Sequence, residues 1–228
     1  MVTNLIARGF LIAVILCAFA ATLSAQKGEA NIYAGGIWPD NTDDFGDFVN
    51  TNIWGGRVGA FVTENVELEG NFGFVNHFNL KNNPNPANAI FGITRPATRA
   101  YVYDLFISWN FGERQAFGTR FAPFLKFGLG GLTTTVADAD EVFLQGGGLT
   151  FFPGTSVVVA NPAPPVVLES GDTFFTFSYG GGLKALRMWG PMGLRADIIG
   201  RTAPNFFGNS LNWWPELTGG LTFSWGEP

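Results

Sequence analysis

The sequence predicts an all-β fold: an eight-stranded antiparallel up-and-down transmembrane β-barrel, preceded by a cleaved signal peptide. Three observations support this fold class. The 228 residues include 31 glycines and 24 phenylalanines but only 14% charged residues, a composition typical of an aromatic, turn-rich β-protein. Apolar residues recur at every second position, as they must in a strand with lipid on one side and a polar interior on the other. Short and long connections also alternate along the chain.

The first 25 residues have the features of a secretory signal peptide. One basic residue, Arg8, precedes an apolar run over residues 10–20, and Ala25 is a small residue suited to a cleavage site. The run is too short for a membrane-spanning helix, and no other stretch of the chain reaches about 18 apolar residues. We therefore expect a signal peptide at residues 1–25 and one barrel domain at residues 26–228.

Charge and cysteine usage narrow the function classes further. The formal net charge is −5, and removal of Arg8 with the signal makes it more negative by one unit. This sign argues against binding of nucleic acid, whose phosphates require a basic surface. Cys17, the only cysteine, lies within the signal, so the mature chain is expected to have no disulfide bond and no thiolate metal site.

The first four strands are predicted from their alternation. Glycines blur the first two, but Arg57 in the second falls opposite Trp54 and Val58. In the third, Glu67 and Glu69 alternate with apolar residues, and in the fourth the parity reverses so that Asp104 lies opposite the aromatic face. These strands are predicted at residues 30–38, 52–62, 66–74 and 101–111.

The next three strands each set a polar face with a basic residue against an apolar face. Lys126, Lys184 and Arg195 lie on these polar faces, and Asp197 shares the face of Arg195. The strands are predicted at residues 121–133, 175–185 and 192–201.

The last strand, residues 218–225, resembles the C-terminal signature of bacterial outer-membrane β-barrels, which the barrel assembly machinery reads during insertion. The matching residues are Thr218, Gly220, Phe223 and Trp225. The family pattern ends at the chain terminus, whereas three residues follow Trp225 here.

The connections divide into short links at residues 63–65, 112–120 and 187–191 and long ones at residues 39–51, 76–98, 134–172 and 202–212. Strict alternation puts the short turns and both termini on the periplasmic side and the long loops outside. We expect a hairpin within residues 134–172, with a ten-stranded barrel as the alternative.

Aromatic residues at strand ends support this orientation, because Trp and Tyr prefer the two membrane interfaces. One expected belt, next to the long loops, contains Trp38, Trp54, Tyr101 and Trp213, and the other contains Trp109 and Trp189.

These features together look like the small outer-membrane barrels of the outer-membrane protein A and X kind. The resemblance includes the runs at residues 123–131 and 193–197 and covers essentially the whole mature chain. It implies a protein of the bacterial outer membrane, in contact with outer-membrane lipid and lipopolysaccharide. It implies architecture more firmly than activity, because this fold hosts anchors, adhesins, narrow pores and lipid-modifying enzymes.

The barrel interior is the first candidate site. Five acidic and five basic residues are expected to face inward: Glu67, Glu69, Asp104, Asp197 and Glu216 with Arg57, Lys126, Lys184, Arg195 and Arg201. We predict that they form a salt-bridge network that plugs the lumen, with a proton or small-ion path as the alternative. Removal of one partner, for example by Lys126→Met, should then cost roughly 3–5 kcal/mol.

Catalysis and metal binding have weaker support. His77 is the only histidine, and nothing places it beside the inward residues Ser108 and Ser178. Acidic clusters in the first and third long loops lack the spacing of a known calcium loop. They comprise Asp40, Asp43, Asp44, Asp47, Asp138, Asp140, Glu141, Glu169 and Asp172.

We therefore predict no metal and no cofactor. The predicted function is a non-enzymatic structural or surface-interaction protein of the outer membrane, whose extracellular ligand the sequence leaves open. A narrow, porin-like pore for small solutes is the first alternative, and a lipid A-modifying enzyme is the second.

Overall fold

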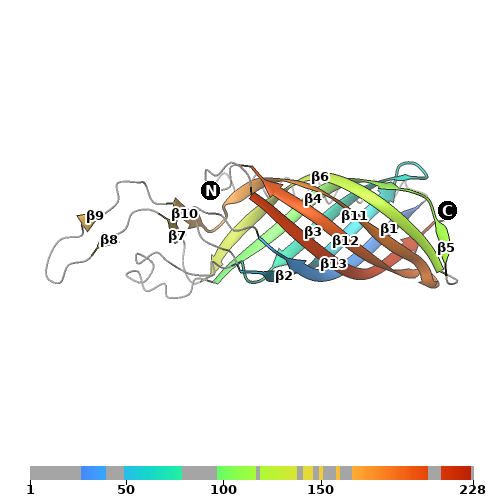
Figure 1. The fold of residues 1–228 in the computed structure, drawn as a ribbon, viewed down its shortest axis with the longest axis horizontal. Helices are drawn as coiled ribbons and strands as arrows, with labels where there is room; N and C mark the ends of the chain where they lie inside the picture. Colours follow the sequence, from blue (N-terminus) through green and yellow to red (C-terminus); the bar gives the residue numbers. More distant parts are fainter. Residues whose placement is uncertain are drawn as a thin grey trace.

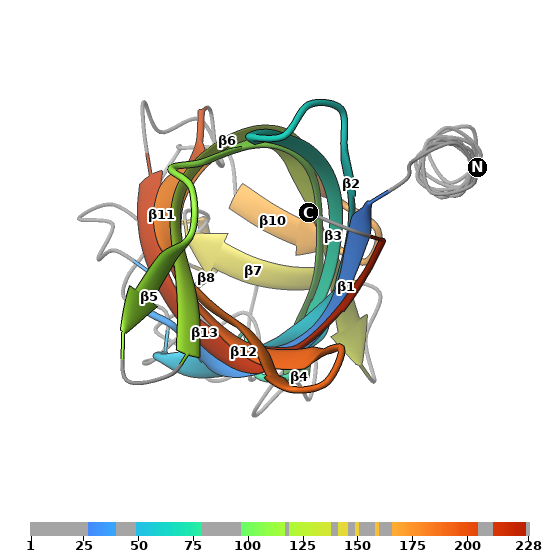
Figure 2. The ribbon, with the colours of Figure 1, turned by 90° about the vertical axis from the view of Figure 1, so that its right-hand side faces the viewer.

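A computed structural model describes residues 27–39, 49–78, 97–116, 119–137, 141–145, 149–150, 158–159, 166–204 and 212–226. Eight strands of the described residues form a closed barrel (Figures 1 and 2). They are β1 (Gly28–Ile37), β2 (Thr51–Phe61), β3 (Val66–Val75), β4 (Ala97–Asn110), β6 (Thr119–Ala137), β11 (Thr173–Trp189), β12 (Met192–Ala203) and β13 (Asn212–Trp225).

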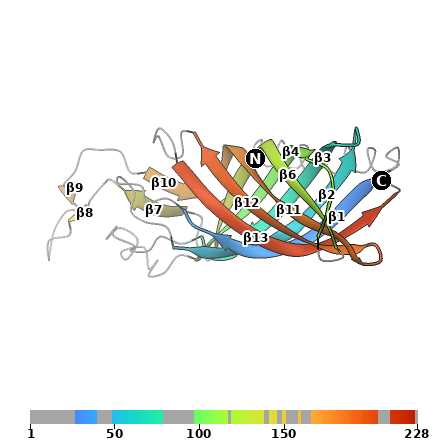
Figure 3. The same cartoon turned by 45° about the vertical axis from the view of Figure 1, so that its right-hand side comes forward.

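Each strand pairs antiparallel with the next one along the chain, and β13 pairs with β1 to close the cylinder. The strands tilt around the barrel axis, as closure requires (Figure 3). The predicted eight-stranded up-and-down barrel is therefore confirmed.

The two ends of the barrel differ in their connections. At one, the turn end, residues 62–65 join β2 to β3 and residues 190–191 join β11 to β12. The link between β4 and β6 lies at the same end and contains β5 (Arg114–Ala116), which pairs with β6. Gly28 lies opposite Trp225, so the first and last barrel strands also begin and end here. At the other end, the loop end, the connections at residues 38–50, 76–96 and 138–172 are longer, whereas the β12–β13 connection, at residues 204–211, is as long as the β4–β6 link at residues 111–118.

The third long connection contains two short ladders that extend beyond the loop end (Figure 1). β7 (Glu141–Gln145) pairs with β10 (Val166–Glu169), and β8 (Leu149–Thr150) pairs with β9 (Val158–Val159). These ladders are separate from the barrel, because β6 pairs directly with β11. The hairpin prediction is therefore correct and the ten-stranded alternative is wrong.

Several barrel strands run further toward the loop end than predicted. β4 begins at Ala97, β6 ends at Ala137 and β13 begins at Asn212. In β13 the difference comes from Pro215, because proline disfavours an interior strand position. Its carbonyl oxygen nevertheless accepts a hydrogen bond from the Trp38 backbone N–H at 2.9 Å, which keeps the chain in the sheet.

The outward face carries large exposed apolar side chains on all eight barrel strands. Ile32, Phe127 and Ile198 are each more than 60% exposed, at 66%, 64% and 65%. So wide an apolar surface is unusual on a protein surrounded by water, and it fits a lipid environment. Among the described residues no helix has the length and apolar character that a membrane crossing requires.

The barrel interior as the candidate functional site

Strand alternation places the ionisable residues of the barrel in the lumen. All ten predicted inward residues are buried, each 3% exposed or less. Glu29 is a sixth buried carboxylic acid, and it was missed because the predicted first strand began one residue later. It shares the parity of Asn31 and Tyr33, which are also buried, so the pattern that identifies it was present in the sequence.

At the centre of the lumen, two carboxylates share three bases. Lys126 Nζ lies 3.3 Å from Glu69 Oε1 and 2.8 Å from Asp197 Oδ1. Arg195 contacts the same two carboxylates, at 2.5 Å and 3.0 Å. Arg57 Nη1 adds a third contact to Asp197 at 2.8 Å. This central cluster is redundant, because neither carboxylate depends on one base.

A second cluster, toward the loop end, centres on Arg201. Its guanidinium contacts Asp104 at 2.5 Å and Glu216 at 3.3 Å. Ser178 Oγ donates to Asp104 Oδ1 at 3.0 Å, and Asn71 Nδ2 donates to Asp104 Oδ2 at 2.8 Å. Arg201 is the one base that contacts Asp104 among the described residues.

Arg57 links these two clusters. Its guanidinium lies 2.8 Å from Asp197 and 3.6 Å from Glu216. It also donates to Thr218 Oγ1 at 2.9 Å and lies 3.8 Å from the centre of the Tyr33 ring. The charges from both clusters therefore belong to one connected network.

A third cluster lies toward the turn end. Lys184 Nζ is 2.8 Å from Glu29 Oε2 and 2.7 Å from Glu67 Oε2. The ammonium group also lies 5.1 Å and 5.4 Å from the ring centres of Phe124 and Phe61. The two aromatic rings thus help to shield the ion pairs of Lys184 from solvent at the turn end.

Apolar side chains fill the lumen between the Arg201 cluster and the loop end. On each strand they lie beyond the charged residues: Leu132 follows Lys126 on β6, and Ala203 follows Arg201 on β12. Phe78 packs edge-on against Trp214 with ring centres 5.6 Å apart. This apolar layer, each member 5% exposed or less, comprises Tyr33, Ile37, Ile53, Val75, Phe78, Ala100, Val102, Leu132, Ala203 and Trp214.

The predicted interface aromatics lie on the outward face. Trp54 is 56% exposed and stacks edge-on against Phe74 at the loop end. By strand position, Trp38, Trp54, Tyr101 and Trp213 lie near the loop end, and Trp109 and Trp189 lie near the turn end.

The residues of the expected assembly signal divide between the two faces of β13. Thr218 is buried in the lumen, and a Cβ on Gly220 would lie 2.1 Å from the Ile32 carbonyl oxygen. Phe223 and Trp225 lie on the outward side, with ring centres 6.3 Å apart. Gly220 is therefore required for the close approach of β13 to β1.

The structure separates the histidine from the two inward serines. His77 is exposed just beyond β3 at the loop end. Ser108 is buried near the turn end, in register with Glu67, and Ser178 is held by Asp104 and Arg201. Neither serine is therefore placed to act with His77.

No group of three or more potential metal-ligating residues gathers among the described residues. The predicted acidic loop residues at positions 40, 43, 44, 47, 138 and 140 lie outside the described residues.

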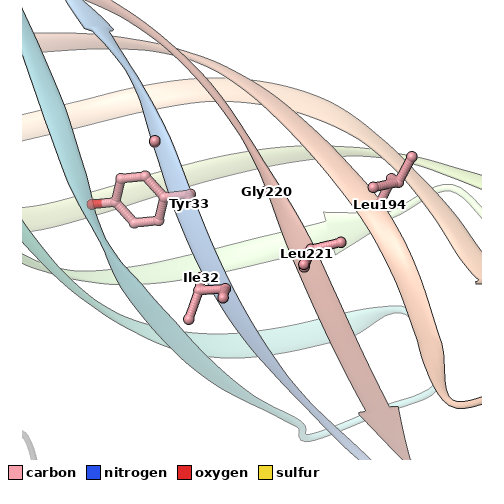
Figure 4. A pocket seen from close by; sticks show the side chains of 6 residues that line it. Ile32, Tyr33, Leu194, Gly220 and Leu221 are labelled. Carbon is pink, nitrogen blue, oxygen red and sulfur yellow. The ribbon is translucent and has the colours of Figure 1, made fainter.

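A shallow hollow marks the outer wall where β12, β13 and β1 run side by side (Figure 4). It is lined by Ile32, Tyr33, Ala34, Leu194, Gly220 and Leu221. The Tyr33 hydroxyl points away from it and donates to Asn71 Oδ1 at 2.9 Å. The other side chains that line it are apolar.

The family described as outer membrane protein beta-barrel domain matches residues 10–201 of this chain. No curated protein sequence was found to match. Neisserial surface protein A has a similar structure, with a TM-score of 0.54 and 11% identity over 86% of this chain and 96% of that one.

Two further solved structures are similar. The N-terminal β-barrel domain of Pseudomonas aeruginosa OprF has a TM-score of 0.49 and 16% identity over 87% and 98% of the two chains. LpxR from Salmonella typhimurium has a TM-score of 0.28 and 12% identity over 88% and 84%.

Proposed function

Because the chain belongs to the family of outer membrane protein β-barrel domains, we propose that it is a non-enzymatic integral protein of the bacterial outer membrane with a structural or surface-interaction role. The observation that carries this proposal is the filled lumen. Eleven ionisable side chains inside the barrel are each 3% exposed or less, and the apolar layer lies above them. An interior packed in this way supports an anchor for surface segments rather than a route for solutes.

The orientation is part of the proposal. We place the turn end in the periplasm and the loop end outside, with lipopolysaccharide around the loop end and outward residues Phe223 and Trp225 available to the assembly machinery. Three of the four loop-end connections are longer than any connection at the turn end, which supports this orientation. The two ladders beyond the loop end are then the segments best placed to meet an extracellular partner (Figure 1).

Single-channel recording in planar bilayers tests the closed lumen. The wild-type protein should give negligible conductance, and a porin in the same bilayers is the positive control. Steady conductance steps from the wild-type protein would contradict the proposed anchor and favour a narrow pore.

A narrow pore is the second candidate, because the three charged clusters extend from the turn end to the apolar layer. That layer alone separates them from the loop end among the described residues. The variant Trp214→Ala removes its largest side chain. If this variant conducts and the wild type does not, the apolar layer is the barrier. A closed variant favours the anchor.

The non-enzymatic part of the proposal is supported by the positions of Ser108, Ser178 and His77. It is tested by mass spectrometry of lipid A from cells with and without the protein. The lipid A species should be the same in both. A change in acylation that depends on the protein would favour the lipid-modifying alternative.

A further inference from the structure

Among the described residues, the lumen contains one more acid than it has bases. Six carboxylic acids and five bases are buried there, each 3% exposed or less. The central cluster and the Arg201 cluster balance each other, because four acids pair there with four bases. These groups are Glu69, Asp104, Asp197 and Glu216 with Arg57, Lys126, Arg195 and Arg201. The excess acid therefore lies elsewhere in the lumen.

The excess belongs to the cluster around Lys184. The ammonium group donates a hydrogen bond to Glu67 Oε2 at 2.7 Å and lies 2.8 Å from Glu29 Oε2. Neither carboxyl group contacts another base among the described residues. Two acids therefore share one positive charge. An uncompensated charge in such an interior is costly, so the second acid requires a further partner.

The oxygens of this cluster also lack hydrogen-bond partners. Glu29 Oε2, Glu67 Oε1 and Ser108 Oγ are buried and have none among the described residues. The contact between Lys184 and Glu29 is thus an ion pair without hydrogen-bond geometry. Ser108 lies in register with Glu67 on the neighbouring strand, so the two side chains face the same part of the lumen. A hydrogen atom is missing where three oxygens are buried together.

The packing around Glu67 favours a proton over a metal ion as the compensating charge. A Cβ on Gly59 would lie 1.9 Å from Glu67 Oε1, so this oxygen lies directly against the backbone of β2. A metal ion requires several oxygen ligands arranged around it, and no group of three or more acidic ligands gathers among the described residues. A proton requires no additional volume.

We propose that Glu29 and Glu67 hold one proton between them at neutral pH, so that the Lys184 cluster consists of one ammonium, one carboxylate and one neutral carboxylic acid. Two carboxyl groups in one site retain a proton in this way, because like charges at close range disfavour ionisation of both. The acid O–H can donate to the other carboxyl group or to Ser108 Oγ. With this proton, the acids and bases of the described lumen balance.

The other charged groups around the site do not replace this proton. On the loop side, the nearest charges are those of the central cluster, which are paired with one another: Glu69 of β3, Lys126 of β6, Arg195 and Asp197 of β12, and Arg57 of β2. At the level of the site, β4 and β13 contribute Ser108 and Ser224, which are uncharged. On the turn side, Lys27 lies 4.6 Å from the ring centre of Phe61 and forms no ion pair with a described residue.

The proton exchanges with water through the turn end. Glu29 is 3% exposed there, whereas Glu67 is fully buried, and the apolar layer closes the loop side of the lumen. The inference rests on the filled lumen of the proposed function, because water in the lumen would solvate both carboxylates. A conducting lumen without the proton would contradict both, whereas a closed lumen without the proton would contradict this inference alone.

Infrared spectroscopy of the purified full barrel, in a detergent without carbonyl groups, tests the proton directly. At neutral pH the wild type should show the carbonyl stretch of a protonated carboxylic acid. Glu67→Gln and Glu29→Gln should each lose this band, because the remaining carboxylate is then matched by Lys184. Asp104→Asn is the matched control, since it removes a buried carboxylate from the balanced clusters and should keep the band. The heat-dependent gel shift checks that each variant is folded.

Urea unfolding at increasing pH gives a second readout. A glutamate in the unfolded chain ionises near pH ~4.3, so unfolding at neutral pH releases the proton. The folded state binds more protons than the unfolded state, and stability therefore falls as the pH rises, until the folded lumen also loses its proton. Relative to Glu67→Gln, the unfolding constant of the wild type should rise about 10-fold per pH unit, which corresponds to one proton.

Three results would overturn the proposal: no acid band in the folded wild type, a band that persists in both Gln variants, or the same pH dependence of unfolding in the wild type and Glu67→Gln. A wild-type unfolding constant that depends on the concentration of Na⁺ or K⁺, with no acid band, would assign the missing charge to a bound metal ion instead.

Discussion

The lumen contains two regions that exclude water in different ways. In the charged region, from Glu29 to the Arg201 cluster, every ionisable side chain requires a partner, because an unpaired charge is costly away from water. In the apolar layer no specific partner is required, and stability depends on filling the volume. The stability lost when one charge is removed should therefore be recovered when its partner is removed as well. The stability lost when apolar volume is removed should not be recovered by a second removal.

The largest loss of stability is expected from Arg201→Met. Asp104 then has no base among the described residues, although Asn71 and Ser178 still donate hydrogen bonds to it. We expect the free energy of unfolding to fall by about 3–5 kcal/mol, the cost of breaking a buried pair. Urea unfolding in detergent micelles, followed by tryptophan fluorescence, measures this change.

The double variant with Asp104→Asn separates pairing from packing. It should recover much of the lost stability, because no buried carboxylate is left unpaired. If the double variant is no more stable than Arg201→Met, the arginine acts through its packed side chain, and the distinction between the two regions fails here.

In the apolar layer, Leu132→Ala should lower the free energy of unfolding by roughly 2–5 kcal/mol through lost burial and a residual cavity. Leu132→Met is the matched control, since it nearly conserves volume and should cost less than about 1.5 kcal/mol. Equal losses for both variants in the same urea titration would show that volume is not the determining quantity.

Lys126→Met should cost less than Arg201→Met, although both remove a buried base. Glu69 and Asp197 each retain Arg195, and Asp197 also retains Arg57. We expect a loss of about 1–3 kcal/mol, as for a buried group that loses one of several partners, in place of the roughly 3–5 kcal/mol predicted from the sequence for a single pair. A loss as large as that of Arg201→Met would mean that the redundancy of the central cluster has no energetic value.

Alternation was sufficient to predict the barrel and most of its charged interior. Lys126 and Asp104 were identified because each lies opposite an exposed apolar face. The partners within the network were harder to predict, since Lys184 reaches Glu67 across strands that are not neighbours. Such pairs depend on register and on the shear of the closed sheet, which no local pattern encodes.

The apolar layer was not predicted, although its signal was present. Ile53 has the inward parity of Arg57, and Leu132 has that of Lys126, so both had to face the lumen. Alternation identifies the inward face only where one face of a strand is polar and the other apolar. Near the strand ends both faces are apolar, so an apolar residue there could not be assigned to the lumen. The loop-side ends of several strands were placed too far toward the turn end. β6, for example, continues beyond Thr133, where the next outward residue, Thr135, is polar.

The smallest loss of stability is expected from a substitution at the turn end, where Arg120 and Glu113 form an exposed ion pair. Arg120 Nη1 lies 3.3 Å from Glu113 Oε2, the same separation as that between Arg201 Nη2 and Glu216 Oε2. The side chains of the exposed pair are 52% and 31% exposed, whereas those of the buried pair are fully buried. Arg120→Gln should therefore change the free energy of unfolding by only about 0–1 kcal/mol, because water screens the pair and solvates the remaining carboxylate. The small loss should shrink further in high salt, whereas the loss for Arg201→Met should persist. A comparable loss for both variants would show that burial does not set the strength of ion pairs in this barrel.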